Sequence, residues 1–262
     1  VSLGRPAEGA SVFKDPSAPP DERYKLVFAG RYRDKRCVFG AVSPDGLRWH
    51  MIEEPVLDDY VSDTQTVVRF DPQKGRYVGY FRGWTSHESK KFHGRRLIAY
   101  AETDRFERWP RPQPIVVPDV HYGPSTDIYT NAYTRWPDAD AHLMFPSFFE
   151  RRLDIFELHM MTSRDGKHWE RPTRRPLIPS GEPGDAAEGL IGAAGGLIKI
   201  RPGEWSTPIT QAKISHNQNR SDKERTKLER TAILTLATWR QDGFMSLDVE
   251  TEGRFTTRPI TF

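Results

Sequence analysis

Four acidic residues that recur at similar intervals are the first candidates for chemistry in this chain of 262 residues. Glu8, Asp63, Asp127 and Glu188 are separated by 55, 64 and 61 residues, and each precedes a run with the pattern of a β-strand. Carboxylates gathered at one site repel each other, which favours the protonated form of one of them. A carboxylic acid beside a carboxylate can hydrolyse a glycosidic bond, because one protonates the leaving oxygen while the other activates water.

The same pattern has a plainer explanation, which stays open at this point. The chain holds 36 acidic residues, so some align by chance, and an aspartate before a strand often caps a turn. We take Asp63, Asp127 and Glu188 as the candidate catalytic residues. The candidates for substrate binding are polar or aromatic residues placed near the ends of the same units: Glu8, Arg82, His87, Tyr129, Asn131 and His216. Arg82 follows an aromatic run, where its guanidinium could bind a substrate hydroxyl or hold a catalytic carboxylate.

A repeated turn marks the elements that must position these residues. The segments 43–49 and 163–169 share the pattern Ser-x-Asp-Gly-x-x-Trp, and a degenerate copy ends at Trp109. The tryptophans of the three copies are 60 and again 60 residues apart, and Asp242-Gly243-Phe244 is a weaker fourth copy. In such a turn the aspartate caps backbone amides, the glycine supplies a positive φ and the tryptophan packs between neighbouring units. The motif is therefore structural, and its residues are poor candidates for chemistry.

Short apolar and aromatic runs lie between these turns, bounded by Pro, Gly and Asp. In the first unit they include 23–28 and 36–42, and runs of this length predict antiparallel strands. Units of this length, with four strands and an Asp turn before a Trp, are typical of β-propeller blades. We predict one all-β propeller domain of four-stranded antiparallel blades. The predicted blades are 8–57, 62–118, 126–180 and 187–250, and 251–262 is a terminal strand or the lead-in to a β-sandwich.

The innermost strands of a propeller run along one central axis, and the residues at their starts converge there. The four acids stand at these starts, so we expect them to face a single pocket. The interval between the repeats thus selects these positions from the 36 acidic residues of the chain.

Composition excludes several other classes of protein. The net charge of +3 is small and spread along the chain, so we expect no nucleic-acid partner, and no apolar stretch approaches the ~18 residues that span a bilayer. The single cysteine, Cys37, excludes an internal disulfide framework and lies in an apolar run, where we expect it to be buried. The sequence also lacks the histidine pair of a zinc site, a phosphate-binding loop and a nucleophile elbow. We therefore expect no cofactor, with a structural calcium ion as an open alternative.

The order of the motifs resembles that of a known group of proteins. The residues that carry the resemblance are 13–16, 22–25, 43–49, 62–65, 76–82 and 240–244. They are similar to bacterial proteins related to glycoside hydrolase families 32 and 43, which are five-bladed propellers acting on fructose, arabinose and xylose units. The resemblance covers nearly the whole chain. It implies a glycosidase with a carbohydrate substrate and a catalytic base, a partner that sets its pKa, and an acid.

Position within the blades assigns these roles to Asp63, Asp127 and Glu188, and the resemblance favours inversion. The repeat gives a little over four units, whereas the family has five blades. We therefore expect the first blade, which usually carries the base, to lie upstream of Val1 or to be missing. An open edge left by a missing blade predicts self-association.

Two alternatives to this enzyme stay open. A propeller that lacks the base could bind carbohydrate without cleaving it, and a six-bladed sialidase-like enzyme has similar Asp turns. The start of the chain does not have the pattern of a signal peptide. We expect a secreted or periplasmic protein if a signal peptide lies upstream, and a cytoplasmic one otherwise.

Overall fold

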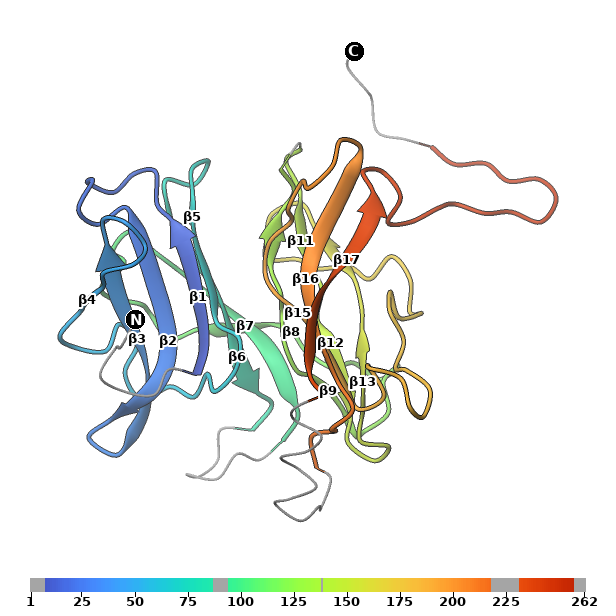
Figure 1. Ribbon diagram of the computed structural model, residues 1–262, viewed down its shortest axis with the longest axis horizontal. Coiled ribbons are helices and arrows are strands. Elements are labelled where there is room, and N and C mark those ends of the chain that lie inside the picture. Colours follow the sequence, from blue (N-terminus) through green and yellow to red (C-terminus); the bar gives the residue numbers. More distant parts are fainter. Residues whose placement is uncertain (1–7, 87–93, 138, 218–230, 257–262) are drawn as a thin grey trace.

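The computed structural model describes residues 8–86, 94–137, 139–217 and 231–256. These residues form β-strands and no helix, and the strands belong to antiparallel sheets arranged around a common axis (Figure 1). Nothing in this part of the chain is a helix long and apolar enough to cross a membrane. The fold is an all-β propeller, as the repeat predicted.

The first two units are four-stranded. Their strands pair in sequence order, from the inner strand outward: β1 (Glu8–Lys14), β2 (Tyr24–Tyr32), β3 (Lys35–Ser43) and β4 (His50–Met51), then β5 (Val67–Asp71), β6 (Arg76–Trp84), β7 (Arg96–Thr103) and β8 (Gln113–Val116). The middle strands read as unbroken apolar runs rather than alternating ones, because the blades pack on both of their faces. In β6, for example, every residue after Arg76 is buried.

The third unit departs from the predicted pattern because each of its strands is interrupted. One half, along the length of the strands, is the sheet of β9 (Thr126–Ile128), β12 (Ser147–Glu150) and β13 (Ile155–Leu158). Its other half consists of β10 (Thr134–Arg135), β11 (His142–Met144) and β14 (Met161–Ser163). Pro146 has no N–H for a ladder, and Ala132 has a φ of 40°, so the backbone cannot continue as a regular strand at these points.

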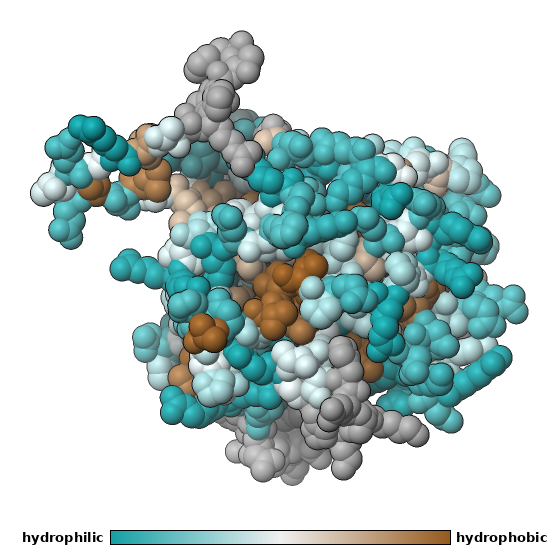
Figure 2. Space-filling view, turned by 180° about the vertical axis from the view of Figure 1, so that it is seen from behind, coloured by the Kyte–Doolittle hydropathy of each residue, from teal (hydrophilic) through white to brown (hydrophobic). Residues whose placement is uncertain are grey.

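The fourth unit has three strands in the described residues: β15 (Leu190–Ala193), β16 (Glu204–Ala212) and β17 (Ile233–Arg240). A fourth strand was predicted, but after Phe244, which packs on the core, residues 245–256 instead form an arm that leaves the propeller (Figure 1). Figure 2 shows this arm projecting from the surface with apolar groups on it, and Leu247 and Phe255 are 81% and 74% exposed. Leu234 on β17 is 76% exposed as well. Self-association through this edge stays a prediction.

Three apolar clusters bury the faces between successive units. Phe81 and Trp109 pack with residues of the first unit, Tyr80 packs with Tyr133 of the third, and Phe149 belongs to the cluster between the third and fourth units. The packing of each sheet against the next therefore fixes the orientation of the inner strands, and with it the positions of the residues at their starts.

The two complete copies of the repeated turn make the same hydrogen bonds. In the second copy, Gly166 N donates to Ser163 Oγ at 2.9 Å, the amides of Lys167 and His168 donate to Asp165 Oδ1 at 2.8 Å, and Trp169 Nε1 donates to the Gly166 carbonyl. The first copy repeats each of these bonds two blades earlier. The turn is structural, as its composition predicted.

Candidate functional site

Asp63 precedes β5 and is held by an arginine from the end of β6. Arg82 Nη1 donates to Asp63 Oδ1 at 2.7 Å, and Arg82 Nη2 donates to the Tyr129 carbonyl at 2.7 Å. The side chain of Arg82 is 1% exposed, whereas that of Asp63 is 26% exposed. Burial lowers the pKa of Arg82, and the negative charge of Asp63 acts in the opposite direction. Of the two functions considered for Arg82, the structure shows that of holding a candidate catalytic carboxylate.

Asp127, in β9, is enclosed by two arginines. Arg96 donates to it from both its backbone amide and its guanidinium, and Arg151 donates from Nε at 2.8 Å and from Nη2 at 2.7 Å. Each carboxylate oxygen thus accepts two hydrogen bonds, and the side chain is 0% exposed. The structure therefore does not place Asp127 in an open pocket. Its carboxylate binds the side chains that surround it.

Tyr129 joins the two aspartate–arginine pairs. The guanidinium carbon of Arg82 lies 4.1 Å from the centre of its ring, and that of Arg96 lies 4.8 Å from it. Contacts of this kind between cations and aromatic rings are attractive. Asp63 and Asp127 therefore lie at the same end of the axis, and two arginines and an aromatic ring separate them.

The two glutamates have partners of their own. Glu188 is half-buried, and its Oε2 accepts a hydrogen bond from Gly184 N at 3.0 Å, which closes a turn before β15. Glu8 is 48% exposed and forms an ion pair of 2.6 Å with Arg36. Within the described residues, no hydrogen bond or ion pair links either glutamate to Asp63. Each of the four acids thus has a partner of its own, and their gathering in one pocket stays a prediction.

Asn131 serves the packing of the blades rather than an open surface. It is 2% exposed, and its side-chain amide donates to the carbonyl of Gln65 at 3.0 Å and to that of Tyr80 at 3.4 Å. Gln65 in turn accepts hydrogen bonds from the amides of Asn131 and Ala132 and donates to the carbonyl of Ala193 at 2.8 Å. The prediction that Asn131 contacts a substrate was therefore wrong, because a ligand cannot reach an amide that is buried between blades.

His216 is exposed and lies against Tyr129, with ring centres 5.2 Å apart. Its ring also contacts that of Phe149 at 5.0 Å. The structure thus brings together two of the predicted substrate-binding residues, His216 and Tyr129, next to Arg82. His87 lies outside the described residues.

Sequence reasoning missed Arg96 and Arg151, which determine the surroundings of Asp127. Arg96 is the first residue of β7 and Arg151 follows β12, so both occupy strand ends of the kind that drew attention to Arg82. Their position at strand ends was the sequence feature that could have identified them as site residues. It could not reveal which carboxylate each arginine binds, because the partners are 31 and 24 residues away in the sequence.

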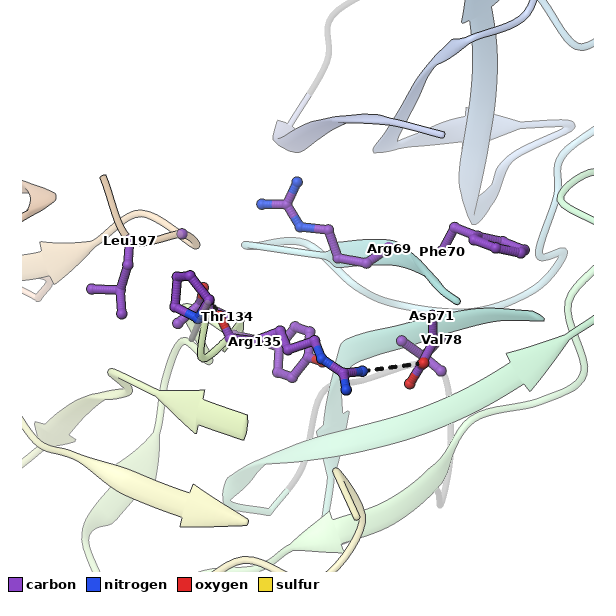
Figure 3. A pocket seen from close by; sticks show the side chains of 10 residues that line it. Arg69, Phe70, Asp71, Val78, Thr134, Arg135 and Leu197 are labelled. Carbon is purple, nitrogen blue, oxygen red and sulfur yellow. Dashed lines mark hydrogen bonds and ion pairs between the residues drawn. The ribbon is translucent and has the colours of Figure 1, made fainter. Parts of the chain in front are cut away.

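A cavity of about 270 Å³ lies at the other end of the inner strands and not at these carboxylates. Its walls come from the ends of β5 and β10 and from the residues after β15, including Arg69, Asp71, Arg135 and Leu197 (Figure 3). The described part of the chain contains no group of three or more His, Cys, Asp or Glu side chains that could hold a metal ion.

No family model and no curated protein matches this sequence. Several solved structures have a fold similar to that of this chain. One is described as a glycoside hydrolase, with 14% identity over 87% of this chain and 66% of its own, at a TM-score of 0.60. Another is a Bombyx mori β-fructofuranosidase of glycoside hydrolase family 32, with 11% identity over 89% of this chain and 46% of its own, at a TM-score of 0.58.

An endo-1,4-β-xylanase from Bacteroides thetaiotaomicron is also similar, with 16% identity over 87% of this chain and 69% of its own, at a TM-score of 0.53. This chain spans less than two thirds of the first two structures, 66% and 46% respectively. Identity this low defines the fold alone. The chain is therefore a β-propeller of the kind that occurs in glycoside hydrolases.

Proposed function

We propose that this protein acts on a glycan as a propeller glycosidase, at the end of the inner strands where Asp63 and Tyr129 lie. The observation that carries the proposal is the state of Asp63. Its Oδ1 is held by the buried Arg82, while 26% of the side chain is exposed. A carboxylate that is fixed on one side and open on the other is suited to take a proton from water. The similar folds of the glycoside hydrolases support the same class of reaction.

Each residue of the site has a separate task in this proposal. Asp63 is the general base, and Glu188, half-buried before β15, is the acid that protonates the leaving oxygen. Asp127 is a positioning residue, because its four hydrogen bonds fix Arg96 and Arg151. The exposed ring of His216, packed on Tyr129, offers a surface against which a sugar can lie.

Hydrolysis at this site consumes one water molecule for each bond cleaved. Asp63 accepts a proton from water as the water oxygen bonds to the anomeric carbon. The bond to the leaving oxygen breaks, and Glu188 gives that oxygen its proton. Water attacks the face opposite the leaving group, so the product has the inverted anomeric configuration.

A panel of aryl furanosides and pyranosides tests this proposal. Wild-type protein should release the aryl group from at least one member, and the first sugar product should have the inverted configuration by NMR. Asp63→Asn and Glu188→Gln should each lower the rate by about 100-fold or more, the usual contribution of a general acid or base. Arg164→Gln, a change at an exposed turn position, is the matched control. Retention of configuration would refute the inverting mechanism.

A second candidate is a protein that binds a glycan without cleaving it, and the enclosure of Asp127 favours it. A carboxylate with 0% exposure and four hydrogen bonds cannot exchange a proton with a substrate. This candidate predicts that an oligosaccharide binds, that no product forms, and that Asp63→Asn leaves the affinity unchanged. Isothermal titration with the same sugars separates the two functions.

A further inference from the structure

The cavity of about 270 Å³ lies at the ends of the inner strands opposite to Asp63 and Asp127. Asp63 precedes β5, whereas Arg69 and Asp71 are near its end, so one strand connects the two places. Phe70, Tyr133 and Leu197 supply apolar wall, and polar side chains line the rest. This volume is slightly below the ~300–1,000 Å³ of most ligand sites and suits a molecule of a few heavy atoms.

The guanidinium of Arg69 has few hydrogen-bond partners among the described residues. Its guanidinium makes one long hydrogen bond in the described residues, from Nη1 to the Val12 carbonyl at 3.4 Å. Figure 3 shows its side chain extending away from Asp71 and Arg135. Burial lowers its pKa, and the opposing contribution comes from Tyr133 rather than from a carboxylate. Arg69 is thus a half-buried cation that has no carboxylate partner among the described residues.

The neighbouring arginine provides a direct contrast. Arg135 donates to Asp71 at 3.2 Å and to Asp140 at 2.9 Å, so its charge is already balanced within the protein. Asp71 also accepts hydrogen bonds from the amides of Gln73 and Lys74, and it is 4% exposed. The carboxylate of Asp71 therefore already binds Arg135 and the backbone of the turn after β5. Of the two arginines that line the cavity, Arg69 is the one whose charge no carboxylate of the described residues balances.

We propose that this cavity binds a small oxyanion, a carboxylate or a phosphate, through the guanidinium of Arg69. A guanidinium presents a planar set of N–H donors that matches two oxygens of such a group. Apolar walls strengthen this bond, because they lower the local dielectric constant around the ion pair. The site is separate from Asp63, and its occupation does not depend on whether the protein cleaves glycans.

Isothermal titration with inorganic phosphate and with acetate, at constant ionic strength and pH 7, tests the proposal. Wild-type protein should bind one anion per chain with a dissociation constant in the millimolar range. Arg69→Gln should weaken this binding at least tenfold, and Arg69→Lys should have an intermediate affinity because it keeps the charge but loses the planar donors. Preference for one probe over the other identifies the chemistry of the natural ligand.

Two control variants make the outcome specific to the cavity. Arg164→Gln removes an exposed arginine elsewhere and should bind as the wild type does. Asp63→Asn should also bind the anion unchanged, so a failure of the proposed glycosidase would leave this result intact. Equal affinity in Arg69→Gln and wild type would overturn the proposal, and so would the absence of saturable binding of both probes. Amide shifts in residues 133–135 and 196–197 of the wild type, but not elsewhere, would locate the anion.

Discussion

The guanidinium of Arg82 connects two parts of the candidate site, since it binds both the carboxylate of Asp63 and the carbonyl of Tyr129. Sequence position predicted that Arg82 lies near the site and left its partner open. The surroundings of Asp127 could not be predicted in this way. Its place at the start of an inner strand could be read from the repeat, but its enclosure depends on Arg96 and Arg151, which come from other strands. Burial and pairing follow from packing, which a single sequence does not specify.

Arg82→Leu should destabilise the protein by about 2–4 kcal/mol, because Asp63 and the Tyr129 carbonyl both lose a buried donor. Urea unfolding measures this loss. Arg164→Gln should change the free energy of unfolding by less than ~0.5 kcal/mol, since it alters an exposed side chain. A double-mutant cycle that combines Arg82→Leu with Asp63→Asn measures the interaction free energy between the two side chains. A loss below ~1 kcal/mol for Arg82→Leu would show that this ion pair does not stabilise the fold.

Cys37 is a buried free thiol, as its place in an apolar run predicted, and it is 1% exposed. Burial, together with the carboxylate of Asp58, raises its pKa to about 11. The thiolate, which is the reactive form, is therefore scarce at pH 8. A disulfide reagent such as DTNB should label the native protein far more slowly than the urea-unfolded protein, and the native rate should rise only as the pH approaches 11. Labelling of native protein at the rate of a free thiol would contradict this environment.

The repeated turn is the element that the sequence predicted best, because its residues bond to one another within a few positions. Both complete copies make the same hydrogen bonds, and both glycines have a positive φ, 76° at Gly46 and 74° at Gly166. The break in the third unit was not predicted. It depends on the conformation of Ala132 and on the place of Pro146 within a strand pair, and neither alters the apolar pattern of the sequence.

Substitution of the two turn glycines by alanine should have unequal effects. A Cβ on Gly166 would lie 2.7 Å from Tyr80 Oη, whereas one on Gly46 would lie no closer than 3.7 Å to any side chain. Gly46→Ala should cost about 1 kcal/mol through its positive φ, and Gly166→Ala about 1–3 kcal/mol more through the contact with Tyr80. Thermal and urea unfolding measure both values. Equal losses would mean that the third unit does not rest on Tyr80 as the structure indicates.

At the scale of the whole molecule, the tryptophan spacing predicted the propeller, and Gln65 shows how its units are joined at the axis. Gln65, from the second unit, hydrogen-bonds the backbone of Asn131 and Ala132 in the third and of Ala193 in the fourth. Nothing in the repeat singles out this glutamine. Its importance arises only once the inner strands are brought together.

Gln65→Leu keeps the size of the side chain and removes all of its hydrogen bonds. We expect a loss of about 2–4 kcal/mol, because two buried amides and one carbonyl are left without partners. We also expect a smaller urea m-value, since units that are less firmly joined unfold less cooperatively. Gln73→Leu, in the turn after β5, is the matched control. Unfolding that is indistinguishable from wild type would show that Gln65 does not couple the units.

The catalytic role of Asp63 is tested most directly by the value of kcat/KM for Asp63→Asn on whichever glycoside the wild type cleaves fastest. We expect the variant to retain about 1% of the wild-type value or less, to be folded as judged by urea unfolding, and Arg164→Gln to remain fully active. Equal values of kcat/KM in Asp63→Asn and in the wild type would show that Asp63 is not the general base.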